Sequence, residues 1–160
     1  MAPDAVSGRT AVGNGSDPAA PSEVSTSLEG GPSLEGKRVV ICEDEAVTQM
    51  QLRRALSRAG LDIVGIATNG KEAVDTTLRE RPDIVLMDIR MPVMDGIAAA
   101  RRIMEAYPVC MVMLTAFAND GYQEQARQLG AAGYIVKPIT SDVLLPLLQE
   151  ALENFHRSRP

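Results

Sequence analysis

The segment "DIVLMDIRMPVMDG", residues Asp83–Gly96, contains an apolar run that stops at a carboxylate. The run Ile84–Met87 predicts a buried strand, and the next residue is Asp88. The pairs Met91-Pro92 and Asp95-Gly96 that follow are typical of loops and turns. A buried strand that ends on a carboxylate carries this group out of the core, to an edge of the sheet where it can react.

The chain from Lys37 onward repeats this alternation of short apolar runs and helical patterns. The apolar runs are "KRVVIC", "LDIVGIA", "DIVLMD", "VCMVMLT" and "GYIVK". The helical patterns between and after them cover 46–59, 69–80, 95–106, 121–129 and the segment from residue 141. The runs are nearly continuous in apolar character, which is typical of parallel strands covered on both faces. With right-handed crossovers, this order predicts a doubly wound α/β fold.

The N-terminal part differs in composition. Residues 1–35 are rich in Gly, Pro, Ala, Ser and Thr and show no hydrophobic period. Ordering a residue costs about 1–2 kcal/mol of backbone entropy, and this stretch has little apolar surface to offset that cost. We predict a disordered tail over 1–35 and one domain over 36–157.

The composition narrows the class of protein. A chain of 160 residues has room for one ordinary domain. Its net charge of -5 and aromatic content of 3% argue against a nucleic-acid surface. The N-terminus lacks the pattern of a signal peptide, and the most apolar run is too short to span a bilayer. We therefore expect a cytoplasmic protein that binds neither nucleic acid nor membrane directly.

Polar residues stand at the ends of the predicted strands. In doubly wound sheets, ligands bind outside the carboxyl ends of the strands. The groups that reach this edge are Glu43-Asp44, Asp88, Thr115 and Lys137-Pro138. At about 4 Å and an effective dielectric constant near 20, each pair of carboxylates repels by about 4 kcal/mol. The carboxylates must take up protons or hold a cation, and oxygen ligands suit Mg2+, with Mn2+ as an alternative.

The same edge carries groups that stabilise a phosphoryl group. Lys137 offers a positive charge and Thr115 a hydroxyl, and both converge on Asp88 in the predicted fold. Asp88 would then be the covalent acceptor. Arg90 and Phe117 lie two residues beyond Asp88 and Thr115 and flank the predicted site.

From Lys37 to Phe155 these motifs resemble the receiver domain of bacterial two-component response regulators. The resemblance implies a (βα)5 fold with strand order 2-1-3-4-5, as in flavodoxin and CheY. It also implies that Glu43 and Asp44 are the acidic pair and that Asp88, in "MDIRMPVMDG", is the phosphoryl acceptor. Lys137 would be the site lysine, in a cis bond to Pro138. The metal ligands would be Glu43, Asp44, Asp88 and the backbone carbonyl of Arg90.

The resemblance further implies a switch. Thr115 in "MLTAF" matches the switch hydroxyl and Tyr134 in "GAAGYIVKP" the switch aromatic. A histidine kinase would supply the phosphoryl group, and the fourth helix, fifth strand and fifth helix would control a partner or self-association. Leu145 and Leu152 lie off the main apolar stripe of the last helix and are candidates for a dimer contact. The chain would catalyse only its own phosphorylation and dephosphorylation.

Alternative interpretations remain. "MVMLTAFA" and "LLPLLQEAL" resemble receivers of antitermination regulators with an RNA-binding ANTAR output, so the chain could be a truncated form that lacks this output. A phosphatase of the haloacid dehalogenase type would need a second aspartate where Arg90 stands. A non-phosphorylated interaction module would be expected to have lost Asp88, Thr115 or Lys137, and all three are present.

Overall fold

The computed structural model describes residues 33–118 and 121–158. These residues form a five-stranded sheet in the order β2-β1-β3-β4-β5, and every neighbouring pair is parallel. The doubly wound fold and the strand order predicted above are confirmed. The strands are β1 (Arg38–Cys42), β2 (Asp62–Ala67), β3 (Ile84–Asp88), β4 (Cys110–Thr115) and β5 (Gly133–Val136).

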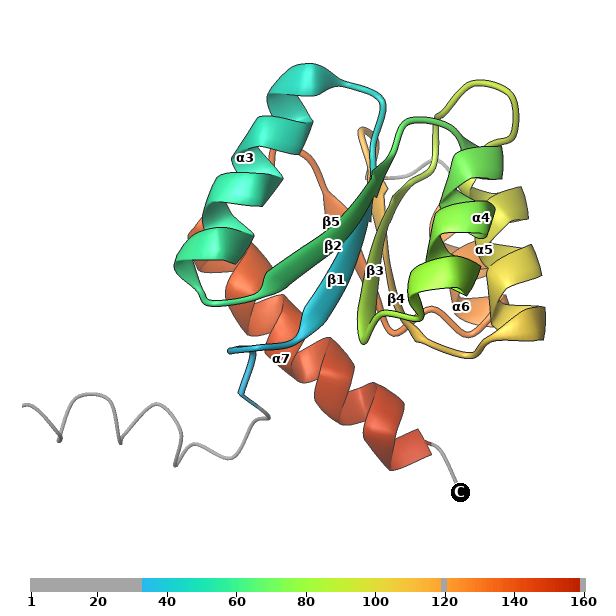
Figure 1. The fold of residues 1–160 in the computed structure, drawn as a ribbon. Coiled ribbons are helices and arrows are strands. Elements are labelled where there is room, and N and C mark those ends of the chain that lie inside the picture. Colours follow the sequence, from blue (N-terminus) through green and yellow to red (C-terminus); the bar gives the residue numbers. More distant parts are fainter. Residues whose placement is uncertain (1–32, 119–120, 159–160) are drawn as a thin grey trace, which may run out of the picture. The chain divides into compact units, whose positions relative to one another are not determined.

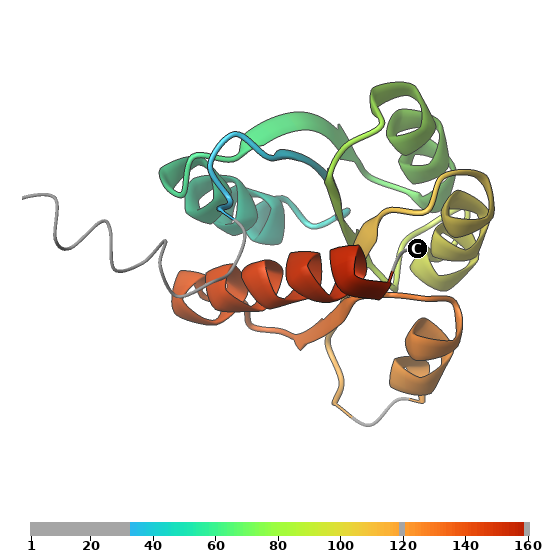
Figure 2. The ribbon, with the colours of Figure 1, turned by 90° about the horizontal axis from the view of Figure 1, so that it is seen from below.

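Helices cover both faces of this sheet (Figure 1). They are α3 (Ala46–Arg58), α4 (Gly70–Glu80), α5 (Gly96–Ala106), α6 (Tyr122–Gln128) and α7 (Ser141–Ser158). Helices α3 and α7 pack on one face, and α4, α5 and α6 on the other. The view from below in Figure 2 shows α7 running beside α3. None of the helices within the described ranges is long and apolar enough to cross a membrane.

The two-sided cover explains the continuous apolar runs. Ile41 and Leu86 belong to the core cluster under α3 and α7, whereas Val40 and Met87 belong to the cluster under α4 and α5. Successive strand residues point to opposite faces, so a strand buried on both sides needs apolar residues throughout. All five residues of β3 are buried. Each large apolar side chain buried in this way contributes about 1.5–3 kcal/mol.

Helix caps fix where the segments after β2 and β3 turn into helices. The Asn69 side chain accepts a hydrogen bond from the Glu72 backbone N–H at 2.9 Å, and Asp95 accepts one from Ala98 at 2.8 Å. Each cap satisfies a backbone donor that has no partner within the helix. The Glu72 carboxylate bonds back to the backbone N–H and hydroxyl of Thr68, one residue before the cap.

The prediction of a dimer contact at Leu152 is wrong. Leu152 is 1% exposed and lies in the same core cluster as Leu144 and Leu148. Leu145 is partly buried and packs against this cluster. Helix α7 contacts both the sheet and α3, so its buried face is wider than one stripe.

The start of the packed domain also differs from the prediction. Residues 1–32 of the predicted tail lie outside the described residues. Leu34, which the prediction placed in the tail, is buried in the core cluster with Leu56 and Leu61. Its carbonyl accepts a hydrogen bond from Lys37, and the Gly36 N–H donates to the Gly60 carbonyl at 2.8 Å. Average composition does not reveal one leucine in a polar stretch, yet its burial makes Leu34 part of the packed domain.

Both edges of the sheet are irregular or short. The pairing of β1 with β2 changes register between Val39 and Val40. The opposite edge strand, β5, has four residues.

Candidate functional site

The carboxylates gather where β1 and β3 end. These strands are adjacent and parallel, with Cys42 aligned to Met87, so the residues that follow emerge at one edge. One carboxylate oxygen from each of Glu43, Asp44 and Asp88 lies within 4.8 Å of the others. Glu43 and Asp88 are buried, and Asp44 is exposed. The structure therefore brings the three predicted acidic residues together.

Lys137 projects into this acidic cluster from the end of β5. Its Nζ lies 3.0 Å from Glu43 Oε1 and 3.5 Å from Asp88 Oδ2. The bond to Pro138 is cis, as the resemblance implied. The lysine side chain is 16% exposed, so water screens these contacts only partly.

Burial and charge shift the titration of both groups. Burial raises the pKa of Asp88 from 3.8 to about 7, and the charge of Glu43 adds to this rise while Lys137 opposes it. Burial disfavours the charged form of Lys137, but the hydrogen bond that Lys137 donates to Glu43 and the charges of Asp88, Glu43 and Glu45 outweigh this effect, and the pKa of Lys137 is raised. One ammonium group thus faces several carboxylates.

The donor set fits a hard divalent cation. Three carboxylates share the site, and Asp44 opens it to solvent. Oxygen ligands with room for water are what Mg2+ prefers, and Mn2+ accepts the same ligands. A bound cation would also offset the excess of negative charge described above.

Thr115 and Tyr134 lie on the neighbouring strands β4 and β5. Thr115 is the last residue of β4 and is 3% exposed. Its hydroxyl accepts a hydrogen bond from the Phe117 N–H at 3.2 Å and donates to the Phe117 carbonyl at 3.3 Å. Tyr134 is aligned with Met113 on β4 and is half-buried against the cluster under α4, α5 and α6.

The loop after β3 folds back on Asp88. The Gly96 N–H donates to the Ile89 carbonyl at 2.7 Å. A Cβ atom at Gly96 would lie 2.0 Å from the Asp88 carbonyl oxygen, which explains the glycine. Within this loop Val93 has φ 71° and is 80% exposed. A β-branched residue is rare in this left-handed region, so the loop is strained there.

Arg90 belongs to the same loop and contacts the loop after β4. Its guanidinium lies over the Phe117 ring, 5.2 Å from the ring centroid. Both residues were expected to flank the site, but their contact with each other was not predicted.

Sequence reasoning also missed Glu45 and Gln49. Glu45 Oε1 lies 3.5 Å from Lys137 Nζ, and the Glu45 N–H donates to Glu43 Oε2 at 3.1 Å. Gln49 Nε2 donates to the Glu43 carbonyl at 2.6 Å. The third acid of "EDE" was a visible signal for Glu45, whereas no pattern in the sequence marks Gln49.

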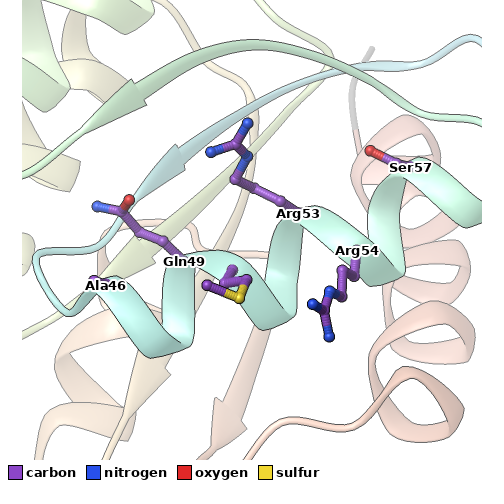
Figure 3. Close-up of a pocket in the computed structure, with 6 residues that line it drawn as sticks. Ala46, Gln49, Arg53, Arg54 and Ser57 are labelled. Atoms are coloured by element: carbon purple, nitrogen blue, oxygen red, sulfur yellow. The ribbon is translucent and has the colours of Figure 1, made fainter.

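A hollow of about 500 Å³ lies along α3, outside the acidic cluster (Figure 3). It is lined by Ala46, Gln49, Met50, Arg53, Arg54 and Ser57. Figure 3 shows Arg53 and Arg54 leaving the helix in opposite directions, so their charges do not converge on one point. This hollow therefore lacks the grouped polar atoms that make the acidic cluster a candidate site.

Comparison with known proteins gives consistent matches. Residues 39–149 match the model of a family described as response regulator receiver domain. The transcriptional regulatory protein PdtaR of Mycobacterium tuberculosis is 42% identical over 119 residues, which cover 74% of this chain and 58% of PdtaR. The chain thus spans little more than half the length of that relative. The chemotaxis protein CheY of Thermotoga maritima is 41% identical over 104 residues, 64% of this chain and 87% of CheY.

A solved structure adds a metal to the comparison. The receiver domain of the sensor histidine kinase PA1611 from Pseudomonas aeruginosa has a TM-score of 0.67 and 33% sequence identity to this chain. The alignment covers 74% of this chain and 98% of that domain. Its structure holds a magnesium ion coordinated in the active-site cleft.

Proposed function

This chain belongs to the response regulator receiver domain family, and on that premise we propose that it is a switch controlled by phosphorylation of Asp88. Receiver domains are phosphorylated by histidine kinases and act on output partners. The observation that carries the assignment to Asp88 is its position at the buried end of β3, 3.5 Å from Lys137 and grouped with Glu43 and Asp44.

The transfer uses Asp88 as nucleophile. A carboxylate oxygen of Asp88 bonds to phosphorus, and the bond from phosphorus to the donor nitrogen of the kinase histidine breaks, with its electron pair staying on that nitrogen. Lys137 stabilises the charge on the phosphoryl oxygens. Asp88 must be ionised to attack, and Lys137 favours this form against the effect of burial.

Mg2+, or Mn2+ in its place, supplies positive charge that offsets the carboxylates and the phosphoryl oxygens when bound. Asp44, Asp88 and the backbone carbonyl of Arg90 would hold the cation directly. Glu43 would act mainly through water, because it is buried and its Oε1 is already paired with Lys137 at 3.0 Å.

This division of labour predicts an order of metal affinities. Asp44→Asn is expected to weaken Mg2+ binding by at least about tenfold, which is about 1.4 kcal/mol. Glu43→Gln is expected to weaken it less, because Glu43 loses only an indirect contact. Calorimetric titration suits this test, since the chain has no tryptophan to report binding by fluorescence. The reverse order would remove Asp44 from the direct ligands.

A phosphodonor of low molecular weight tests the function without the kinase. Incubation with acetyl phosphate and Mg2+ is expected to add one phosphoryl group to the chain, detected by mass spectrometry. Hydroxylamine should remove it, because it cleaves acyl phosphates, and a metal chelator should prevent its addition. An unchanged mass with Mg2+ present would refute phosphorylation and favour an interaction module that is not phosphorylated.

The output follows from Thr115 and Tyr134. The Thr115 hydroxyl turns toward the phosphoryl group, and the space it leaves lets the Tyr134 ring turn inward. This changes the surface of α6, β5 and α7, where a partner or a second copy binds. Complete switching from 1:99 to 99:1 needs about 5.5 kcal/mol, and hydrogen bonds to a charged group contribute about 1.5–3 kcal/mol each. Val136 and Val143 expose apolar surface there.

The similarity to PdtaR favours a second candidate for the output. In that case the chain is the receiver part of a transcriptional regulator, and RNA binding would need a further segment. The chain itself catalyses no reaction beyond its own phosphorylation and dephosphorylation.

A further inference from the structure

Phe117 and Arg90 join the two loops that border the acidic cluster. Phe117 follows β4 and Arg90 follows β3, and the guanidinium lies 5.2 Å from the ring centroid. We propose that the Arg90–Phe117 stack is a latch that holds the Thr115 hydroxyl in its resting position, which makes both residues positioning residues for the switch. This inference rests on the proposed function, because it concerns the regulation of the same site.

In the resting structure the Thr115 hydroxyl is tied to Phe117 by hydrogen bonds. Its hydroxyl is hydrogen-bonded to Phe117 in both directions, at 3.2 Å and 3.3 Å. A hydroxyl has one hydrogen to donate. When Thr115 donates to a phosphoryl oxygen on Asp88, it cannot also donate to the Phe117 carbonyl. The contact between Thr115 and Phe117 must therefore change whenever the switch is thrown.

The backbone on both sides of Arg90 is held in place. The Ile89 N–H donates to the Leu114 carbonyl at 3.1 Å, and the Ile89 carbonyl accepts from Gly96 at 2.7 Å. Ile89 and Met91, on either side of Arg90, are both buried. The backbone at Arg90 is thus anchored to the end of β3, so the Phe117 ring that stacks on Arg90 is fixed relative to the sheet.

The Phe117 side chain is unusually exposed for an aromatic residue. Its side chain is 53% exposed, although most large apolar side chains among the described residues are buried. The guanidinium gives this ring a defined partner, and the free energy of exposed pairs of this kind shifts an equilibrium by about two- to fivefold. Such an energy is small for the stability of a domain but large enough to bias a local two-state equilibrium.

A latch makes a prediction that a merely stabilising contact does not. If the stack favours the resting conformation of the loop, its loss should raise the affinity for any ligand that prefers the switched conformation. The gain in affinity should equal the factor by which the stack shifts the equilibrium toward the resting conformation. Beryllofluoride, which bonds to a carboxylate in the manner of a phosphoryl group, is a suitable probe in the presence of Mg2+. A merely structural stack would change the melting temperature and leave this affinity unchanged.

The central experiment compares two substitutions of Phe117. Phe117→Leu keeps an apolar side chain but removes the ring face, and it is expected to tighten beryllofluoride binding by about two- to fivefold. Phe117→Tyr keeps the ring face and is expected to bind as the wild type does. Arg90→Gln should give the same gain as Phe117→Leu, and the double variant no more than either. Dissociation constants from NMR titration of the full chain provide the measurement.

A Thr115→Ala background supplies the control. Without the hydroxyl, binding of the probe no longer needs the loop to move, so Phe117→Leu is expected to have no effect there. An equal gain in both backgrounds would overturn the latch, and so would equal affinities of wild type and Phe117→Leu. If the wild type fails to bind beryllofluoride with Mg2+, the proposed function itself fails, and the latch falls with it.

Discussion

Asparagine in place of Asp88 is expected to end labelling by acetyl phosphate completely. The amide of asparagine does not replace a carboxylate as nucleophile, and the other acids of the site are assigned to holding the cation. Mass spectrometry of wild type and Asp88→Asn under identical conditions checks this. Undiminished labelling of the variant would move the acceptor to another residue.

The same substitution is expected to stabilise the metal-free protein at neutral and higher pH. The pKa of Asp88 is raised from 3.8 to about 7 by burial and by Glu43, so the folded chain keeps a proton that the unfolded chain releases. The free energy of unfolding of the wild type therefore falls as pH rises through this interval. Lys137 stays charged throughout, because its pKa is raised from an already high 10.5.

Urea unfolding with a chelator, at about pH 5 and about pH 8, measures this effect. At the higher pH, Asp88→Asn is expected to exceed the wild type by about 1–3 kcal/mol, with a smaller gain at the lower pH. Asp75→Asn is the matched control, because Asp75 is a well-exposed carboxylate on α4. A wild type whose stability rises over this interval would show that Asp88 ionises freely in the folded protein.

Alanine at Gly96 is expected to destabilise the fold by at least about 3 kcal/mol. The new Cβ would meet the Asp88 carbonyl oxygen at 2.0 Å and its carbon at 2.8 Å, and both atoms are backbone. No side chain can move aside, so the loop itself must shift, together with the residue proposed to accept the phosphoryl group.

Gly121→Ala is the control for Gly96→Ala. Gly121 has φ 81° and no atom within 4 Å of its added Cβ, so it tests backbone strain without a clash. It is expected to cost about 1–2 kcal/mol. Urea unfolding measures both variants, and equal losses would mean that the approach to Asp88 is not tight.

The strands themselves follow from local features of the sequence, whereas their order in the sheet was implied by the resemblance to receiver domains. Strand β3 is apolar over Ile84–Met87 because both of its faces are covered by helices. Asp95 marks the start of the next helix, because its side chain caps that helix. The burial of Leu34 and Leu152 could not be predicted in the same way. Each is buried by elements distant in sequence, and neither the polar stretch around Leu34 nor the stripe of α7 reveals those neighbours.

The candidate site likewise contains residues that the sequence predicts and contacts that it does not predict. Strand ends placed Glu43, Asp88, Thr115 and Lys137 at one edge, because parallel strands share their carboxyl edge. The contact of Glu45 with Lys137 depends on how the start of α3 meets the segment after β5, and the Arg90–Phe117 stack depends on the paths of two loops. Hydrophobic period and turn propensity do not determine such paths.

The two outer strands have a consequence for how molecules of this protein meet. A regular, exposed strand offers a row of unpaired backbone groups to which a strand of another molecule can add. Here one outer strand, β2, pairs with β1 through a register change that falls between Val39 and Val40 of β1, and the other outer strand, β5, has four residues. Neither aligns many backbone groups for an incoming strand. We therefore expect concentrated solutions to resist sheet-extending aggregation, and contacts between copies to form through side chains.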